Sequence, residues 1–443
     1  MGKIITIAGP NGSGKTLYVE QMRRQMASDS VRYMAFCDSY GQRTDRAYYL
    51  QQRWNQHDID PETPTVAQAI DRTCLLLGHH TDSQDDYRHG LIAMMGLEES
   101  LDKYVIQLSS GELRKLQLVK TLLAHPTTLI IDNPFIGLDG PTRQQLRHLL
   151  ARLAEEQDIT IYFVVARESE VMGEKQALPR PLPAGRGVII TGPCFSDAES
   201  DYSPLSPLSE GSGEAGLREG LPEACLPVVE LRHVSIRYGE RTILNDIDWT
   251  IREGEHWALC GRNGSGKSTL LSLICADNPQ AYACDISLFG RQRGTGETIW
   301  DIKRRIGYVS PEMHRSYQRN LPAMQVVASG LKDTVGLYVR PNDAERELCR
   351  RAMLRFGVGD MAERPFLTLS SGEQRLVMLA RAFVKEPPLL ILDEPLHGLD
   401  DKNSEMVKGI IEEYCANQRN TIIMVSHYEE ELPKCIDRRM TLG

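Results

Sequence analysis

The chain has 443 residues and a formal net charge of -9, from 51 Lys and Arg against 60 Asp and Glu. This length predicts two or three domains. The mildly acidic balance gives no reason to expect non-specific binding to nucleic acid or membrane surfaces, although it does not exclude a local basic patch. The 10 cysteines show no zinc-site spacing, and the sequence has neither a signal peptide nor the run of roughly 18 apolar residues that a membrane span needs. We therefore expect a soluble cytoplasmic protein with reduced thiols, either free or peripheral at the inner face of the cell membrane.

The first predicted element is an apolar strand over residues 4–8, which leads into a glycine-rich turn and then a helix. In the pattern Gly-x-x-x-x-Gly-Lys-Ser/Thr, backbone N–H groups point at phosphate oxygens, and the helix N-terminus adds a favourable potential for anions. The lysine reaches the β- and γ-phosphates, and the hydroxyl is offered to Mg²⁺. A glycine turn at an unrelated strand–helix junction is the plainer alternative. The pattern predicts ATP contacts by Gly9, Asn11, Gly12, Gly14, Lys15 and Thr16.

A second anion-binding motif precedes an acidic strand end. The sequence Leu-Ser-Ser-Gly-Glu places Ser109, Ser110 and Gly111 at the start of a helical pattern, where capping and the helix dipole favour an anion. The apolar run 129–131 then ends at Asp132, which lies 21 residues after Gly111. Open parallel sheets bind ligands at this carboxyl edge, so Asp132 is predicted to hold the Mg²⁺ hydration shell.

The middle of the chain predicts a flexible tether. Residues 177–227 are rich in Pro, Gly, Ser and Glu and separate a first domain, 1–176, from a second, 228–443. The run 188–190 leaves open whether a last strand of the first domain lies inside it. Residues 228–255 alternate like short antiparallel strands. Nothing comparable precedes the first phosphate loop, so either the first domain lacks this nucleotide-base subdomain or the start codon is misplaced.

The second half repeats the motifs of the first half in the same order. The spacing from Gly372 to Asp393 is again 21 residues. Several motifs recurring in one order with matched spacing indicate an internal repeat rather than chance. The repeat predicts ATP contacts by Gly261, Asn263, Gly264, Ser265, Gly266, Lys267, Ser268, Thr269, Ser370, Ser371 and Gly372. Ser268 and Asp393 are predicted to lie near Mg²⁺, as are Thr16 and Asp132 in the first half.

The two halves differ where hydrolysis would occur. Glu394 is the natural group to orient and deprotonate the attacking water, although a surface carboxylate at a strand end would look the same. His427 ends another apolar strand, 34 residues after Asp393. The first half is interpreted as having Asn133 in place of Glu394 and Arg167 in place of His427. Asparagine cannot accept the proton, whereas arginine still pairs with phosphate, so ATP binding is expected to persist there.

Together these motifs resemble the ATP-binding cassette (ABC) family, and the two LSSGE loops are the discriminating signal. The resemblance implies an α/β fold with two P-loop domains, each a mainly parallel sheet flanked by helices with a helical signature subdomain. It also implies head-to-tail pairing, in which Ser110 and Gly111 complete the site of Lys267, and Ser371 and Gly372 complete that of Lys15. Two P-loop domains that never pair are the alternative.

The same resemblance assigns further roles. His427 would contact the γ-phosphate, and Tyr238 would stack on adenine, although a tyrosine in a half-buried strand needs no ligand. The glutamine that the family has after the next strand is not evident. Glu312 is its candidate in the second half, and Gln42 has no firm assignment in the first half.

The stretch 278–310, and above all its GETIWDIK run, is similar to the second cassette of the ModF family. These are tandem ABC ATPases associated with molybdenum uptake and also labelled photorepair proteins. The resemblance implies ATP and Mg²⁺ as cofactors and a membrane permease as partner. The sequence shows no molybdate site, so a free-standing cassette pair that acts on ribosomes, RNA or DNA stays open. A small-molecule P-loop kinase is opposed by the two signature loops.

Overall fold

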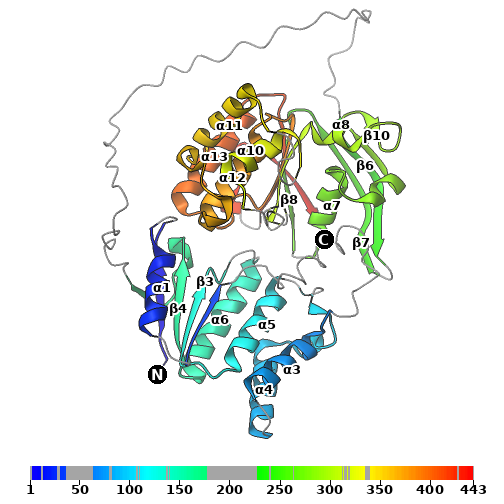
Figure 1. Cartoon of the computed structure of the whole chain (residues 1–443). Coiled ribbons are helices and arrows are strands. Elements are labelled where there is room, and N and C mark those ends of the chain that lie inside the picture. The colour runs from blue at the N-terminus through cyan, green and yellow to red at the C-terminus, as the bar shows by residue number, and fades with distance from the viewer. Residues whose placement is uncertain are drawn as a thin grey trace, which may run out of the picture. The chain divides into compact units, whose positions relative to one another are not determined.

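The computed structural model describes residues 2–10, 13–26, 30–35, 63–78, 82–105, 108, 110–135, 138, 140–176, 227–238, 241–262, 264–311, 313, 317, 320–334, 340–426 and 429–442. The described parts of both halves belong to one compact unit. The predicted tether and the run 188–190 lie outside the described residues, so the domain boundaries at 177 and 227 stay predictions. Each half contains a parallel sheet with helices on both faces, as Figure 1 shows.

The first half has a sheet of five parallel strands in the order β2-β3-β4-β1-β5. This order places β1, which leads into the phosphate loop, between β4 and β5. The bounds are β1 Ile4–Ala8, β2 Val31–Ala35, β3 Thr128–Asp132, β4 Thr160–Val165 and β5 Glu174–Gln176.

Alternating side chains of these strands pack into separate clusters on the two faces of the sheet, as the period of two in a strand requires. Ile130 and Val164 pack with Val19 of α1, Lys15–Gln25. Their strand neighbours Ile131 and Phe163 pack in a larger cluster that includes the buried residues of α5, Ser110–Leu122, and α6, Gly140–Glu156.

Helices α3, Val66–Leu77, and α4, Asp82–Met95, complete the first half and pack against α5. Helix α3 begins with a capping box, in which Thr65 and Gln68 each satisfy a backbone N–H of the other residue. Because α5 starts at the LSSGE loop, these helices form the helical subdomain around the first signature loop.

The second half repeats this plan with a sheet in the order β11-β12-β13-β8-β14, again all parallel. Its bounds are β8 His256–Gly261, β11 Ile306–Val309, β12 Leu389–Asp393, β13 Thr421–Val425 and β14 Arg438–Leu442. The helices are α7 Lys267–Ile274, α8 Ile299–Lys303, α10 Ala323–Ala328, α11 Asp343–Arg355, α12 Ser371–Phe383 and α13 Asp401–Cys415. The two sheets have equivalent strand orders, so the repeat in sequence is also a repeat in topology.

The predicted antiparallel strands are present in the second half as a four-stranded sheet in the order β10-β9-β6-β7. Their bounds are β6 Pro227–Tyr238, β7 Arg241–Arg252, β9 Asp285–Leu288 and β10 Arg291–Gln292. Strands β6 and β7 pair with several register shifts. The described residues of the first half contain no antiparallel sheet, in agreement with the sequence.

The GETIWDIK run forms a tight turn followed by α8. Arg293 Nη1 and the backbone N–H of Gly294 both donate to Glu297 Oε1 at 2.8 Å, and the ion-paired side chains are 1% and 5% exposed. Thr298 and Asp301 then form the capping box that begins α8. The Glu297 carboxylate also accepts from the backbone N–H of Thr295 at 3.1 Å, so both of its oxygens are hydrogen-bonded within the turn.

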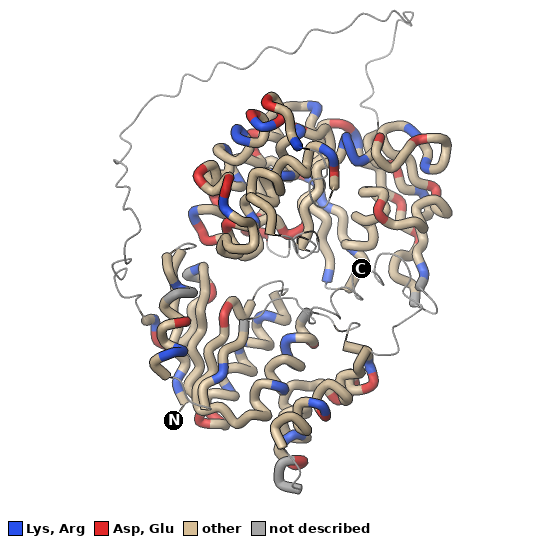
Figure 2. The backbone as a smooth tube through the Cα atoms, in the orientation of Figure 1, with Lys and Arg blue, Asp and Glu red and all other residues tan. Residues whose placement is uncertain are grey.

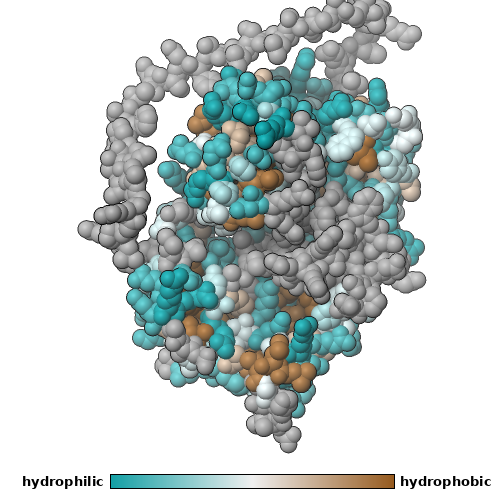
Figure 3. All heavy atoms as spheres, in the orientation of Figure 1, coloured by the Kyte–Doolittle hydropathy of each residue, from teal (hydrophilic) through white to brown (hydrophobic). Residues whose placement is uncertain are grey.

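Figure 2 shows Lys and Arg interspersed with Asp and Glu over the described residues of both halves. The visible surface of the described residues is mostly hydrophilic, interrupted by small apolar patches (Figure 3). Two of the most exposed large apolar residues are Leu75 and Leu76 near the end of α3, at 66% and 81%. Among the described helices, none is long and apolar enough to cross a membrane.

Candidate nucleotide sites

The last glycines of the two phosphate loops have nearly the same backbone conformation. Gly14 and Gly266, with φ of 85° and 93°, cap α1 and α7 from the left-handed region that favours glycine. Lys267 Nζ donates to the carbonyl oxygens of Gly261 at 2.7 Å and Arg262 at 2.9 Å. Lys15 makes the corresponding bonds to the carbonyls of the first loop. Both lysines therefore lie in the curl of their loop, where an anion would be bound.

Several predicted contacts fall outside the described residues. These are Asn11, Gly12, Ser109, Asn263 and His427, with Glu312 and Gln42, and the side chains of Thr16, Ser110 and Tyr238. Their proposed roles stay predictions from sequence.

The second loop also packs against the antiparallel sheet. A Cβ atom built on Gly266 would lie 2.8 Å from Leu244 Cδ2 and 3.0 Å from the Ile243 carbonyl oxygen of β7. The same atom on Gly14 would meet nothing within 4 Å. Gly266 is thus required both for its backbone conformation and for a close approach, whereas Gly14 is required for conformation alone.

Asp132 and Asp393 end β3 and β12, as predicted. Tyr33 Oη donates to Asp132 Oδ2 at 3.1 Å, and burial raises the pKa of this carboxyl against the opposing effects of Tyr33 and Lys15. Burial likewise lowers the pKa of Lys15, opposed by the charges of Asp132 and Asp400. Lys15 and Asp132 therefore carry opposite charges in one partly desolvated site, and such an arrangement is typical of binding sites.

Asn133 and Glu394 are equivalent in three dimensions. Both have left-handed backbone conformations, with φ of 52° and 50°. Both donate their backbone N–H to the neighbouring strand, to the Val164 oxygen at 2.9 Å and to the Val425 oxygen at 3.0 Å. A non-glycine residue with positive φ is uncommon, so its occurrence at the same point of both repeats indicates equivalent positions. The predicted pairing of these two residues is therefore supported by their geometry.

The predicted pairing of Arg167 with His427 is wrong by one residue. Strand register pairs Asp132 with Val164 and Asp393 with Val425. Two residues beyond each valine stand Ala166 and His427, so Ala166 occupies the switch position of the first half. Arg167 corresponds to the next residue of the second half. The first half still lacks the histidine, and at this position it has no polar side chain.

The second signature loop caps its helix, as predicted. Ser370 and Glu373 form a capping box at the start of α12. In the first loop, Gly111 is buried, and a Cβ there would lie 2.9 Å from Thr142 Cγ2. Glycine is required at this position because α6 approaches the loop closely.

Sequence reasoning missed a buried arginine behind the second site. Arg375 of α12 is 3% exposed and donates to the carbonyl oxygens of Asp393, at 3.0 Å, of Glu394, and of Pro395, at 3.3 Å. It thereby fixes the backbone that carries Glu394. Its place three residues after Gly372 is matched by Arg114 after Gly111, and this repeated arginine was the available signal.

The chemistry of the predicted metal ligands fits Mg²⁺. Asp393 is buried at the sheet edge, and Ser268 lies exposed at the start of α7. Carboxylate and hydroxyl oxygens are the hard donors that Mg²⁺ selects, and it retains several waters when it binds nucleotides.

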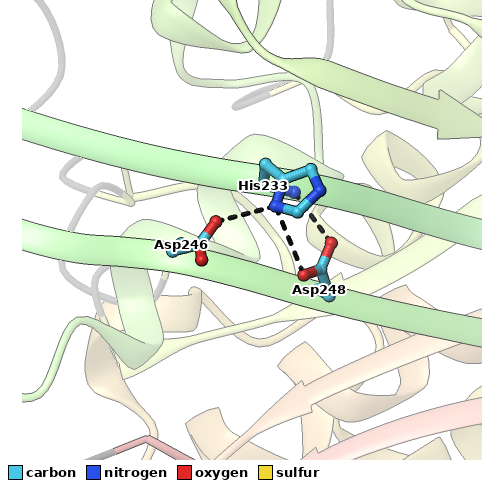
Figure 4. Close-up of side chains that lie close together, drawn as sticks. All are labelled: His233, Asp246 and Asp248. Carbon is cyan, nitrogen blue, oxygen red and sulfur yellow. Dashed lines mark hydrogen bonds and ion pairs between the residues drawn. The ribbon is translucent and has the colours of Figure 1, made fainter.

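A second group of ligand-type residues lies away from both loops, on β6 and β7 (Figure 4). His233 Nδ1 is 2.8 Å from Asp246 Oδ1 and 3.6 Å from Asp248 Oδ2. The hydrogen bond to Asp246 and both carboxylate charges raise the pKa of His233. All three side chains are exposed, and the contacts of His233 with the two carboxylates account for their arrangement without a bound metal.

The comparisons with known proteins agree with this geometry. The family model described as ABC transporter matches residues 1–136 and 244–397. The ABC transporter ATP-binding protein ModF of Escherichia coli is 38% identical over 358 residues, which cover 79% of this chain and 72% of that protein. An uncharacterized ABC transporter ATP-binding protein of Schizosaccharomyces pombe is 31% identical over 78% of this chain and 70% of its own length. Because the family model covers both halves and these relatives match over most of their length, the chain belongs to the ABC transporter family, as a tandem ATPase of the ModF type.

Proposed function

We propose that the chain binds two ATP molecules in an intramolecular head-to-tail arrangement and hydrolyses ATP mainly at one of the two sites. The hydrolytic site combines Lys267, Asp393 and Glu394 of the second half with the signature loop of the first half. The observation that carries the proposal is the contrast between Glu394 and Asn133 at equivalent left-handed positions.

The reaction at this site would use the second-half residues in fixed roles. Glu394 orients a water molecule and accepts its proton as the water oxygen bonds to the γ-phosphorus. The bond from that phosphorus to the β–γ bridging oxygen breaks, and its electron pair leaves with ADP. Lys267 neutralises charge on the β- and γ-phosphates. Ser268 and Asp393 would hold Mg²⁺, which supplies charge neutralisation on the same oxygens.

The first site has the lysine and the acid of strand β3 but lacks both groups that act on water. Asn133 cannot accept a proton at neutral pH, and Ala166 has no polar atom for the γ-phosphate. We infer that Lys15 and Asp132 hold an ATP that turns over slowly. A slow site next to a fast one provides a long-lived nucleotide that keeps the two halves together.

The test compares matched substitutions in the full chain. Glu394→Gln removes the base and is expected to lower kcat by about 10²–10⁴-fold. Asn133→Ala alters the equivalent residue of the slow site and should leave kcat within about twofold, because no base is lost there. Steady-state MgATP hydrolysis gives both values, and bound nucleotide per chain in Glu394→Gln should approach two. Equal losses of kcat in the two variants would exclude the proposed asymmetry.

We further propose that the chain is the cytoplasmic ATP-binding component of a transport system, of the molybdate type by its resemblance to ModF. The exposed Leu75 and Leu76 on α3 support a protein partner, since a surface for nucleic acid would be basic. A free-standing ATPase that acts on ribosomes, RNA or DNA is the alternative. Affinity capture with Glu394→Gln in ATP, compared with ADP, distinguishes them: recovery of a membrane permease supports transport, and recovery of ribosomes or nucleic acid contradicts it.

A further inference from the structure

Arg167 makes its side-chain contacts with the other half of the molecule. Its Nε donates to the carbonyl oxygen of Leu399 at 3.0 Å, and its Nη2 donates to that of Leu396 at 2.7 Å. Its Nη1 forms an ion pair with Glu431 Oε1 at 2.7 Å. Each side chain of this ion pair is only 15% exposed, so the interaction is largely protected from water and salt.

The residues that Arg167 contacts belong to two segments that flank the proposed hydrolytic site. Leu396 and Leu399 lie in the loop that follows Glu394 and leads to α13. Glu431 accepts a second hydrogen bond from Ser426 Oγ, at 2.7 Å on its other oxygen. Ser426 directly precedes His427 in the chain. One guanidinium therefore joins the segment after the proposed base to the segment that carries the switch histidine.

The turn that carries Arg167 is braced within its own half. Glu170 donates its backbone N–H to the Arg167 carbonyl at 3.2 Å, and Arg143 of α6 forms an ion pair with Glu170 at 3.8 Å. Arg147 of the same helix donates to the Ser169 carbonyl at 2.9 Å. Helix α6 is thus linked to the turn that carries Arg167 by one ion pair and one side-chain hydrogen bond.

We propose that Arg167 is a positioning residue that couples the first half to the hydrolytic site of the second. When the halves are together, its guanidinium fixes the loop after Glu394 and, through Glu431 and Ser426, the segment before His427. In this role it acts through the loop and Glu431, by the contacts of its three side-chain nitrogens. The inference rests on the proposed function, because it takes Glu394 as the base of the active site.

The shape of the contact set explains why arginine is used here. Two backbone carbonyls and one carboxylate are reached by three different nitrogen atoms of one planar group. A lysine has a single nitrogen and cannot satisfy three acceptors in this fixed arrangement. Arg167→Lys is therefore expected to behave as an intermediate, keeping the ion pair and losing the orientation of the loop.

The test measures steady-state MgATP hydrolysis by the full chain. Arg167→Ala and Glu431→Gln should each lower kcat about tenfold, with KM for ATP within about twofold of wild type, because positioning is lost and nucleotide contacts are kept. The double variant should also be about tenfold lower rather than a hundredfold, because both changes remove one interaction. Arg152→Ala on α6 is the matched control, since Arg152 is 59% exposed and pairs only with Glu156 along its helix.

Three outcomes would overturn the coupling role: kcat of Arg167→Ala equal to that of the control, a loss confined to KM, or multiplicative losses in the double variant. Thermal unfolding of each variant checks that it is folded, and Arg167→Lys and Glu431→Gln carry the test if Arg167→Ala is not. Glu394→Gln is measured in parallel. Normal turnover in Glu394→Gln contradicts the proposed function itself, whereas its loss beside a normal Arg167→Ala contradicts the coupling alone.

Discussion

Replacing the last loop glycine by alanine should affect the two halves unequally. Gly14 and Gly266 have nearly the same left-handed conformation, so alanine costs about 1–2 kcal/mol of backbone strain at either position. At Gly14 no atom of the described residues lies within 4 Å of the added methyl group. At Gly266 the methyl group would lie 2.8 Å from Leu244 Cδ2 and 3.0 Å from a backbone oxygen of β7.

The difference between the two variants is therefore a packing energy. Overfilling a well-packed contact costs about 1–3 kcal/mol, and the backbone oxygen of β7 cannot move as a side chain can. The total for Gly266→Ala is about 2–5 kcal/mol, against about 1–2 kcal/mol for Gly14→Ala. At about 3 °C per kcal/mol for a domain of this size, the Tm of the second half should fall by about 6–15 °C and that of the first by about 3–6 °C.

Thermal unfolding without nucleotide measures these shifts, and two transitions are expected because each half has its own core. Three of the four tryptophans lie in the second half, including Trp249 and Trp257 with ring centroids 5.6 Å apart, so fluorescence reports mainly on that half, once Trp54 of the first half is replaced by Phe in every variant. Circular dichroism follows both halves. Gly264→Ala is a control within the same loop, because Gly264 has a φ of 82° and no atom within 4 Å of the added Cβ. Equal Tm shifts for Gly264→Ala and Gly266→Ala would refute the packing argument.

Three other predictions follow from the described geometry. In a chain whose second site has been inactivated, Asn133→Glu with Ala166→His should raise residual turnover at least about tenfold, because a base and a switch histidine are supplied together; no gain in the ATPase assay would contradict the register assignment. Glu297→Ala should destabilise the second half by about 3–5 kcal/mol in denaturant unfolding, since it leaves a buried arginine unpaired; a change under about 1 kcal/mol would show that the turn relaxes. Iodoacetamide at pH 8 should alkylate Cys435 before Cys349, because a hydrogen bond with the Cys415 thiol lowers the pKa of Cys435 whereas burial raises the pKa of Cys349 to about 11. Peptide mass spectrometry gives the order of alkylation, and the reverse order would contradict this prediction.

The sequence alone predicts the parts of this protein whose chemistry demands particular residues at fixed spacing. Gly266 and Lys267 are identified because a phosphate loop needs them at a strand–helix junction, and that junction is where the structure has it. Asn133 is paired with Glu394 because each follows an acid that ends a buried strand. Two α/β sheets follow from two copies of the same strand and helix pattern.

Other features depend on contacts that spacing does not encode. The sequence analysis places Arg167 where His427 stands, whereas strand register shows that Ala166 holds that position. The partners of Arg167 lie 229 to 264 residues away in the chain, and no local sequence pattern predicts these contacts. The buried position of Arg375 is likewise set by the loop that folds over it.

Asn133 and Glu394 share one backbone geometry, so the fold at this position does not depend on whether the side chain can act as a catalytic base. Asparagine is among the side chains that tolerate left-handed backbone most readily, so a glutamate there can be exchanged for it with little structural penalty. The strand end, its hydrogen bond to the next strand and the loop beyond are all retained in the first half. One copy of a duplicated nucleotide site can therefore lose hydrolysis and come to regulate the other copy. This takes changes at only a few side chains and leaves the backbone fold as it was.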